Sequence, residues 1–302
     1  MTQEAASQIV RTPNGLKVLA PAKINLSLLV AGKRPDGFHE IETVMAKINL
    51  FDELLIEPGT QEGIELVCQG PSWAPKGKKN LIYKAVELLL KKANQQAEIK
   101  ITLTKNIPAG AGLGSASTDA AAALVGVDEF LGLGLDMGQL GGLASQLGSD
   151  ISFFLGGPLA FCTGRGEKIQ KIERIFNFEA ILLLPNVSCS TKKVYANYTH
   201  ERQRFENFKS KIDALLEKNR IDLVAKMCAN MLDSACFDLH RELAELKAKV
   251  ESFGIEPLCL SGSGSAMYHI IETSDRGRVD EYLDFIEKQC DCECVIITNN
   301  RW

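Results

Sequence analysis

The chain has 302 residues, and at roughly 150 residues per domain this length predicts two domains. Apolar residues make up 45% and charged residues 24%, which excludes a disordered, collagen-like or coiled-coil protein. With 34 Lys and Arg against 38 Asp and Glu, the net charge is −4, so no overall basic surface for nucleic acid is expected. A local anion site remains open, because net charge says nothing about one pocket.

No stretch of the sequence approaches the roughly 18 apolar residues of a membrane span, and the N-terminus lacks the apolar core of a secretory signal. The nine cysteines are an odd number in a chain too long to need cross-links, which predicts reduced thiols and a cytoplasmic location. Cys290, Cys292 and Cys294 are expected on one face of a strand. Their alternate spacing differs from the C-x-x-C pairs of zinc sites, which disfavours a metal centre there.

The first half of the chain predicts strands that flank one helix. Residues 16–30 read as one or two strands interrupted at Pro21, and residues 48–58 as another. Asn80 is expected to cap a helix, because the residues after it repeat apolar positions at helical spacing. Residues 97–105 alternate as a half-buried strand.

The rest of the chain continues this mixture. A glycine-rich loop at 108–114 precedes an Ala-rich helix at about 117–131, and 155–168 predict a turn, a strand and a turn. A buried strand at 179–185 is expected to open the second domain, the segment 200–250 is mostly helical, and 257–271 and 292–298 hold the last strands. Hairpin-like pairs in the first 60 residues argue against a purely parallel sheet, so the expected class is α+β with two domains.

The strongest local motif is the run P-A-G-A-G-L-G-S-A-S-T-D that begins at Pro108. Its glycines let backbone N–H groups approach an anion, and the helix that follows adds the positive end of its dipole. The run is not a Walker A loop, since no Lys-Ser/Thr follows the last glycine, and Ser115 breaks the dinucleotide pattern. Alone, it fits a phosphate cradle and a tight capped turn equally. A second loop, L-S-G-S-G-S-A at 260–266, alone favours a glycine hairpin, but two such loops suggest a polyphosphate.

Three polar residues stand out from their surroundings. Lys23 interrupts an apolar run, which a solvent-facing position on a strand would explain. Asp150 precedes I-S-F-F and could simply cap that turn. The functional alternative makes the two an ion pair at an acceptor hydroxyl, and local spacing does not decide between these readings. His39 follows Phe38 just past a P-D-G turn, where it could be structural or could read the edge of a base stacked on Phe38.

Together these segments resemble the GHMP kinases, the superfamily of galactokinase, homoserine kinase, mevalonate kinase and phosphomevalonate kinase. The superfamily's strand motif, central P-x-G-x-G-L-G-S-type loop and C-terminal G-S-G-type loop correspond in order to 21–26, 108–118 and 260–266. A finer resemblance, from about residue 18 to 270, is to one branch, the 4-diphosphocytidyl-2-C-methyl-D-erythritol kinases. It rests on P-A-K-I-N-L, G-K-R-P-D-G-F-H-E-I-E-T-V, G-S-D-I-S-F-F-L-G-G and T-G-R-G-E-K.

The resemblance implies a GHMP-type fold with an ATP-binding domain over 1–170, a substrate-side domain over 171–302 and an active site in the cleft between them. It implies that ATP, with Mg²⁺ bridging its phosphates, phosphorylates the tertiary hydroxyl of cytidine-diphosphate methylerythritol in the non-mevalonate isoprenoid pathway. Such a hydroxyl must be aligned and deprotonated, with Asp150 as the base and Lys23 as its cationic partner. The Mg²⁺ ligands stay unassigned, with Ser115 or Ser117 as candidates. The implied substrate residues are Asn25, Phe38, His39, Thr191 and Tyr195, with Phe38 and Tyr195 sandwiching the cytosine; the implied nucleotide residues are Pro108, Ala109, Gly110, Ala111, Gly112, Leu113, Gly114, Ser115, Ala116, Ser117 and Thr118, with Asn80 and Lys105 nearby.

The central loop departs from the branch's common G-G-G-L-G-G-G-S-S-N. Ser115 and Ala116 stand where that pattern has glycines, so a positive φ at either would be strained. Two other functions stay in view. One is a related kinase for homoserine, a sugar or a mevalonate derivative, against which the two rings and His39 argue. The other is a non-catalytic ligand sensor, against which the presence of both Lys23 and Asp150 argues.

Overall fold

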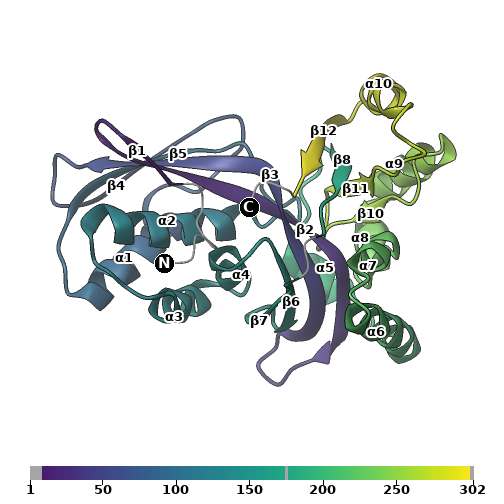
Figure 1. The fold of residues 1–302 in the computed structure, drawn as a ribbon, viewed down its shortest axis with the longest axis horizontal. Coiled ribbons are helices and arrows are strands. Elements are labelled where there is room, and N and C mark those ends of the chain that lie inside the picture. Colours follow the sequence, from purple (N-terminus) through teal and green to yellow (C-terminus); the bar gives the residue numbers. More distant parts are fainter. Residues whose placement is uncertain (1–8, 174–175, 300–302) are drawn as a thin grey trace.

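The computed structural model describes residues 9–173 and 176–299. Two sheets lie in the two halves of an elongated molecule (Figure 1). The first sheet has eight strands in the order β1-β2-β3-β5-β4, with β6, β7 and β9 joined at its side. Its strands are β1 (Ile9–Thr12), β2 (Gly15–Lys33), β3 (His39–Pro58), β4 (Gly63–Gln69), β5 (Glu98–Thr104), β6 (Leu159–Gly164), β7 (Lys168–Lys171) and β9 (Ala229–Asn230).

A long antiparallel pair, β2 with β3, connects the two halves of the fold. The strand predicted at 16–30 is a single one that continues past Pro21, where the register with β3 shifts. This shift lets Pro21 sit in a central strand, since a bulge tolerates the missing N–H donor. β3 begins at His39, earlier than predicted from residue 48, and pairs first with β6 and then with β5. The pair therefore runs from the turn at residues 34–38 to the centre of the first sheet.

Helices α1 to α4 pack on the first sheet (Figure 1). The predicted Asn80 cap is confirmed, since Asn80 Oδ1 accepts a hydrogen bond from the Ile82 amide at 2.9 Å. The Ala-rich helix begins at Ser115, two residues before the predicted start. Small alanines on α2 allow this helix to lie close to β2, and its buried face includes Ala120 to Leu124. The bounds are η1 (Gly77–Lys79), α1 (Leu81–Ala93), α2 (Ser115–Leu131), α3 (Met137–Leu147) and α4 (Ile151–Leu155).

The second sheet has four antiparallel strands in the order β10-β11-β8-β12. The strand predicted at 179–185 is its buried strand β8, and the mostly helical stretch before residue 250 is also confirmed. The loop 261–266 joins β10 to β11 in a hairpin. The bounds are β8 (Glu179–Leu184), α5 (Thr191–Asn197), α6 (Arg202–Glu217), α7 (Ile221–Lys226), α8 (Asp233–Leu239), α9 (Arg241–Ser252), β10 (Cys259–Leu260), β11 (Met267–Ile270), α10 (Val279–Cys290) and β12 (Glu293–Thr298).

The cysteines differ from the expectations in two ways. Cys290 ends α10, and only Cys294 of the C-terminal trio lies on a strand, so the prediction of one strand face is wrong. Asp291, which has a positive φ, ends α10 between Cys290 and Cys292. Cys228 and Cys259 form a disulfide, so the expectation of reduced thiols is wrong for this pair, while the other seven cysteines are free.

Among residues 9–173 and 176–299, no three His, Cys, Asp or Glu side chains are grouped as a metal site. Over the same residues, none of the helices combines the length and the apolar character needed to cross a membrane.

Candidate active site

The glycine loop and the N-terminus of α2 form a concave backbone surface. Within this loop, positive φ values occur only at Gly110, Gly112 and Gly114. Ser115 and Ala116 are helical, so the backbone strain expected at these two residues does not arise. Gly114 occupies the N-cap and supplies no side chain. The first amide of α2 to donate within the described chain is that of Thr118, to Gly114 O at 2.9 Å. The amides of residues 115–117 are therefore left to bind an anion, which is the donor set a phosphate group requires.

Gly112 is fixed by its neighbours as well as by its φ. A Cβ at this position would collide with the backbone carbonyl of Ser261 in the β10–β11 loop. The Lys23 ammonium donates to the Gly112 carbonyl from the other side, and Ser261 Oγ donates to the same oxygen at 3.1 Å. The glycine loop is thus held between β2 and the second sheet. A larger residue at Gly112 is expected to weaken folding as well as nucleotide binding.

Lys23 is buried, with 4% of its surface exposed, so a solvent-facing position does not explain it. Its ammonium donates to Asn25 Oδ1 at 2.6 Å as well as to the Gly112 carbonyl. The Asn25 side chain in turn donates to Thr43 Oγ1 at 2.8 Å, so β3 fixes its orientation. Burial lowers the pKa of Lys23, and the negative charge of Asp150 opposes that shift. The two residues thus interact electrostatically, although they are not in direct ion-pair contact within the described chain.

Asp150 precedes α4 but does not cap it with its side chain. The carboxylate accepts no hydrogen bond from the described residues, which leaves it available to a ligand. Burial raises the pKa of Cys162 to about 12 and also raises that of the Tyr195 hydroxyl, and the negative charge of Asp150 adds to both shifts. The capping explanation for an acid at this position therefore fails, and a half-buried carboxylate faces Lys23 across the site.

Lys47 holds the other end of α4, and the sequence alone gave no sign of this role. It lies directly opposite Lys23 in the β2–β3 register. Its buried ammonium donates to Phe154 O at 2.9 Å and Gly156 O at 2.7 Å, the carbonyls at the C-terminal end of the helix. Burial lowers the pKa of Lys47 to about 7. The short helix α4, which directly follows Asp150, is thereby tied to β3, the strand that pairs with the Lys23 strand β2.

Aromatic side chains form the opposite end of the site. The rings of His39 and Tyr195 lie 5.0 Å apart at an interplanar angle of 32°. Phe38 is 53% exposed, and the Arg165 guanidinium lies 5.0 Å from its ring centre. His39, not Phe38, contacts Tyr195, so the pair of rings expected around a base is not closed. Burial, with Lys33 and His200 adding to it, lowers the pKa of His39, which favours the neutral form of its ring.

Thr191 begins α5 and faces the second glycine loop. Its hydroxyl lies 2.9 Å from Ser263 Oγ. Gly262 and Ser263 border the same cavity as Thr191, so the loop is both a hairpin, as one reading of the sequence proposed, and part of the site. Ser263 was not singled out from the sequence.

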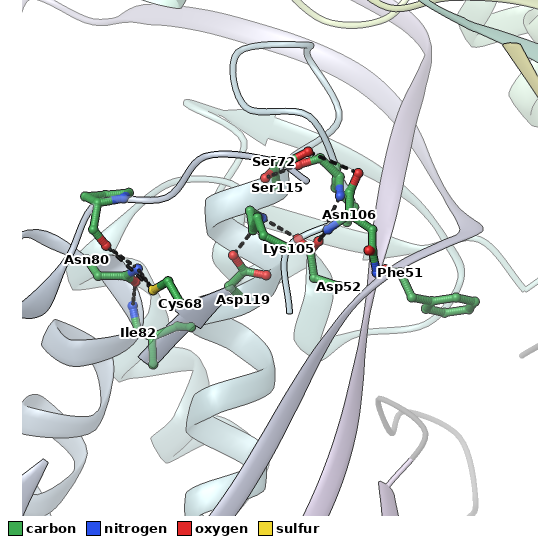
Figure 2. A network of polar contacts seen from close by, with 12 residues as sticks. Phe51, Asp52, Cys68, Ser72, Asn80, Ile82, Lys105, Asn106, Ser115 and Asp119 are labelled. Carbon is green, nitrogen blue, oxygen red and sulfur yellow. Dashed lines mark hydrogen bonds and ion pairs between the residues drawn. The ribbon is translucent and has the colours of Figure 1, made fainter. Parts of the chain in front are cut away.

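Asn80 and Lys105 line the cavity, but their polar groups hold the protein together (Figure 2). Besides capping α1, Asn80 donates to Pro75 O at 2.8 Å. The buried Lys105 ammonium forms an ion pair with Asp52 and donates a hydrogen bond to Asp119 Oδ2 at 2.8 Å. The other Asp52 oxygen accepts hydrogen bonds from the amides of Asn106 and Ile107, at 2.6 and 2.8 Å. These contacts fix the backbone that leads into the glycine loop.

Asp119 stands where the branch's common loop has Asn, and its surroundings explain how an acid fits there. Burial raises the pKa of Asp119 well above its ordinary value against the attraction of Lys105, and Asp52 raises it further. Its Oδ1 is buried and receives no hydrogen bond from the described residues. A protonated Asp119 can donate to Asp52 while accepting from Lys105, as an Asn amide would.

We expect Asp119→Asn to stabilise the protein, increasingly so as pH rises. The unfolded chain loses the Asp proton near pH 4 whereas the folded chain keeps it, so wild-type stability falls by up to ~1.4 kcal/mol per pH unit until the raised pKa is passed. Asn carries no such proton. Urea unfolding of both proteins from pH 4 to 9 measures the difference, with Asp119→Ala as a control that loses stability at every pH. Parallel curves for wild type and Asp119→Asn would contradict the protonated state.

The predicted site residues meet at one cavity of about 1170 Å³. Its wall includes both Lys23 and Asp150, the glycine loop from Pro108 to Ser117, and the aromatic end. Thr118 is the exception: it is buried, and its hydroxyl has no partner in the described chain. Trp73, which is 71% exposed, and Arg165 also border the cavity, and neither was chosen from the sequence.

Comparison with known proteins agrees with this geometry. The family models "GHMP kinases N terminal domain" and "GHMP kinases C terminal" match residues 80–158 and 212–291. The chain is 36% identical over 261 residues to 4-diphosphocytidyl-2-C-methyl-D-erythritol kinase from Bacillus cereus (strain B4264), covering 86% of this chain and 90% of the relative. It is 37% identical over 265 residues to the enzyme of the same name from Bacillus thuringiensis (strain Al Hakam), covering 87% and 90%.

Solved structures give the same result. A crystal structure of 4-(cytidine 5'-diphospho)-2C-methyl-D-erythritol kinase has a TM-score of 0.73 at 30% identity, covering 93% of this chain and 98% of that one. Homoserine kinase from Cytophaga hutchinsonii has a TM-score of 0.73 at 16% identity, covering 96% of each chain, which is a likeness of fold alone. The protein belongs to the GHMP kinases, as the sequence motifs predicted. Within that family, it is an ATP-dependent kinase with the expected mixed α and β fold.

Proposed function

We propose that this kinase transfers the γ-phosphoryl group of ATP to the tertiary hydroxyl of 4-diphosphocytidyl-2-C-methyl-D-erythritol, in isoprenoid precursor synthesis by the non-mevalonate route. The observation that carries the proposal is the single cavity shared by a phosphate-binding loop, a Lys–Asp pair and an aromatic end. The names of the Bacillus relatives support the choice of acceptor. An acceptor with a base explains the aromatic end, which homoserine, sugar and mevalonate acceptors would leave unused.

Asp150 and Lys23 can fill complementary roles in the proposed reaction. Asp150 accepts no hydrogen bond from the described residues and would take the hydroxyl proton as the oxygen attacks phosphorus. Among the described residues, Asn25 and Gly112 accept two of the three N–H donors of Lys23, which leaves the third for a phosphoryl oxygen or for Asp150. Fixed donors of this kind stabilise the charge that develops in phosphoryl transfer without having to reorganise.

The phosphate loop also fits a Mg²⁺ ion that is held mainly by phosphates. Mg²⁺ usually keeps several waters and takes few protein ligands, so a large acidic cluster is not required. Ser115 Oγ donates to Ile107 O at 3.2 Å, whereas the Ser117 hydroxyl has no partner among the described residues. We propose Ser117, rather than Ser115, as the protein ligand of the ion. When bound, the ion would neutralise charge on the transferred phosphoryl group.

The proposal retains the division into an ATP-binding domain over 1–170 and a substrate-side domain over 171–302. The second sheet supports it because all its strands follow residue 171, although β9 returns to pair with β2. A cytoplasmic location is proposed too, supported by the seven free cysteines.

The test is an ADP-release assay with ATP, Mg²⁺ and a panel of acceptors: the cytidine-diphosphate compound, homoserine, galactose and mevalonate. We expect kcat/KM to be highest for the cytidine-diphosphate compound. A higher value for another acceptor would overturn the substrate assignment. Binding of the panel without any turnover would indicate a ligand sensor instead.

A further inference from the structure

Arg165 lies between the aromatic end of the cavity and Asp150. It occupies the tight turn between β6 and β7, where Gly164 and Gly166 have positive φ values of 77° and 114°. Its guanidinium lies over the Phe38 ring. The adjacent Gly166 is so close to the carboxylate that a Cβ there would lie 3.3 Å from Asp150 Oδ1. The turn therefore touches both ends of the acceptor site.

The charge of Arg165 is only loosely neutralised. Its nearest ion-pair partner among the described residues is Glu167, at 4.0 Å from Nε, and Asp36 interacts with it at longer range. Glu167 is itself engaged, accepting a hydrogen bond from the Arg165 amide at 2.6 Å. By contrast, Lys23 and Lys105, two other cations of the cavity wall, are buried and bound by protein oxygens.

We propose that Arg165 binds the diphosphate of a nucleoside-diphosphate-linked alcohol. This inference rests on the proposed function, which places a base near Phe38 and the reacting hydroxyl at Asp150. Any such acceptor carries its diphosphate between those two groups, and that is where the Arg165 turn lies. A guanidinium can give two parallel hydrogen bonds to phosphate oxygens, and its stacking on Phe38 orients it before the ligand arrives. Arg165 thus links recognition of the base to recognition of the diphosphate.

The experiment compares inhibition constants of cytidine, CMP and CDP, taking only the component competitive with the acceptor at saturating ATP, so that binding in the ATP site does not contribute. For wild type we expect CDP to bind roughly tenfold to a hundredfold more tightly than cytidine. Arg165→Met should reduce the preference for CDP over cytidine to a few-fold, mostly by weakening the binding of CDP. Arg165→Lys, which keeps the charge but loses the planar fork, should give an intermediate ratio. Tyr195→Ala is the matched control, because it should weaken all three ligands and preserve the ratio.

Two results would overturn the inference while the proposed function survives. One is that Arg165→Met leaves the inhibition constants of both cytidine and CDP unchanged. The other is an equal loss for cytidine and CDP, which would mean that Arg165 only supports Phe38. If wild type instead binds cytidine, uridine and adenosine compounds alike, the proposed function fails, and the Arg165 assignment fails with it. Thermal unfolding of Arg165→Met, expected near the wild-type Tm since the side chain is partly exposed, verifies that the fold is intact.

Discussion

Replacing Asp150 by Asn is expected to lower kcat by about 10²–10⁴-fold, the usual loss when a general base is removed. The amide keeps the size of the side chain but cannot take the proton of the acceptor hydroxyl. The stability of the fold should change little, because the Asp150 side chain neither caps α4 nor accepts a hydrogen bond from the described residues. Nucleotide binding should also survive, since the glycine loop is held by Lys23 and the second sheet.

Steady-state kinetics, nucleotide binding and urea unfolding of the same preparation separate these effects. Asp284→Asn is a suitable control, since it removes an exposed carboxylate on α10 that pairs with Lys288 at 2.7 Å. Wild-type turnover in Asp150→Asn would remove Asp150 from the mechanism. Loss of stability in Asp150→Asn alone would restore its interpretation as a structural cap.

The parts of the fold that sequence predicted well are those set by local patterns. Alternation marked β5, helical spacing after Asn80 marked α1, and the run of glycines followed by alanines marked the loop and α2. Each depends on neighbouring residues only. The strain expected at Ser115 and Ala116 did not arise, because the conformations that need glycine fall on the three glycines that this chain retains.

Other features depend on residues far apart in the chain, which local patterns cannot show. In the sequence, Lys47 is indistinguishable from an exposed lysine on a strand. Its role is seen only in the structure, where β3 pairs with β2 and Lys47 donates to the end of α4. The resemblance places Lys105 near the nucleotide site, and the structure shows that Asp52 and Asp119, 53 and 14 residues away, bind its ammonium. The resemblance suggested that Lys23 and Asp150 act together. That burial lowers the pKa of Lys23 and that Asp150 opposes this shift could be recognised only from the structure, which shows that Lys23 is buried.

A uridine analogue of the proposed acceptor is expected to have a kcat/KM roughly tenfold or more below that of the cytidine compound. Stacking contributes ~1–3 kcal/mol per base but barely separates one base from another. Discrimination must therefore come from the edge of the base. Uracil replaces the exocyclic amine of cytosine by a carbonyl, and an unmatched buried polar group costs about 1–3 kcal/mol. We expect His39 to make that distinction, because its lowered pKa favours the neutral ring, which has one donor and one acceptor nitrogen.

The structure refines how this should be tested, because His39 lies against Tyr195. Tyr195→Ala removes a stacking surface and also the support of His39, whereas Tyr195→Phe keeps the ring. We expect Tyr195→Ala to lower kcat/KM for both analogues by a similar factor, because both bases lose the same stacking surface. Tyr195→Phe should behave like wild type. His39→Ala should narrow the difference in kcat/KM between the two analogues. The measurement is kcat/KM for both analogues in the four proteins. Equal values in wild type would show that no residue of the cavity reads the cytosine edge, and a base-free acceptor would then account better for the aromatic end.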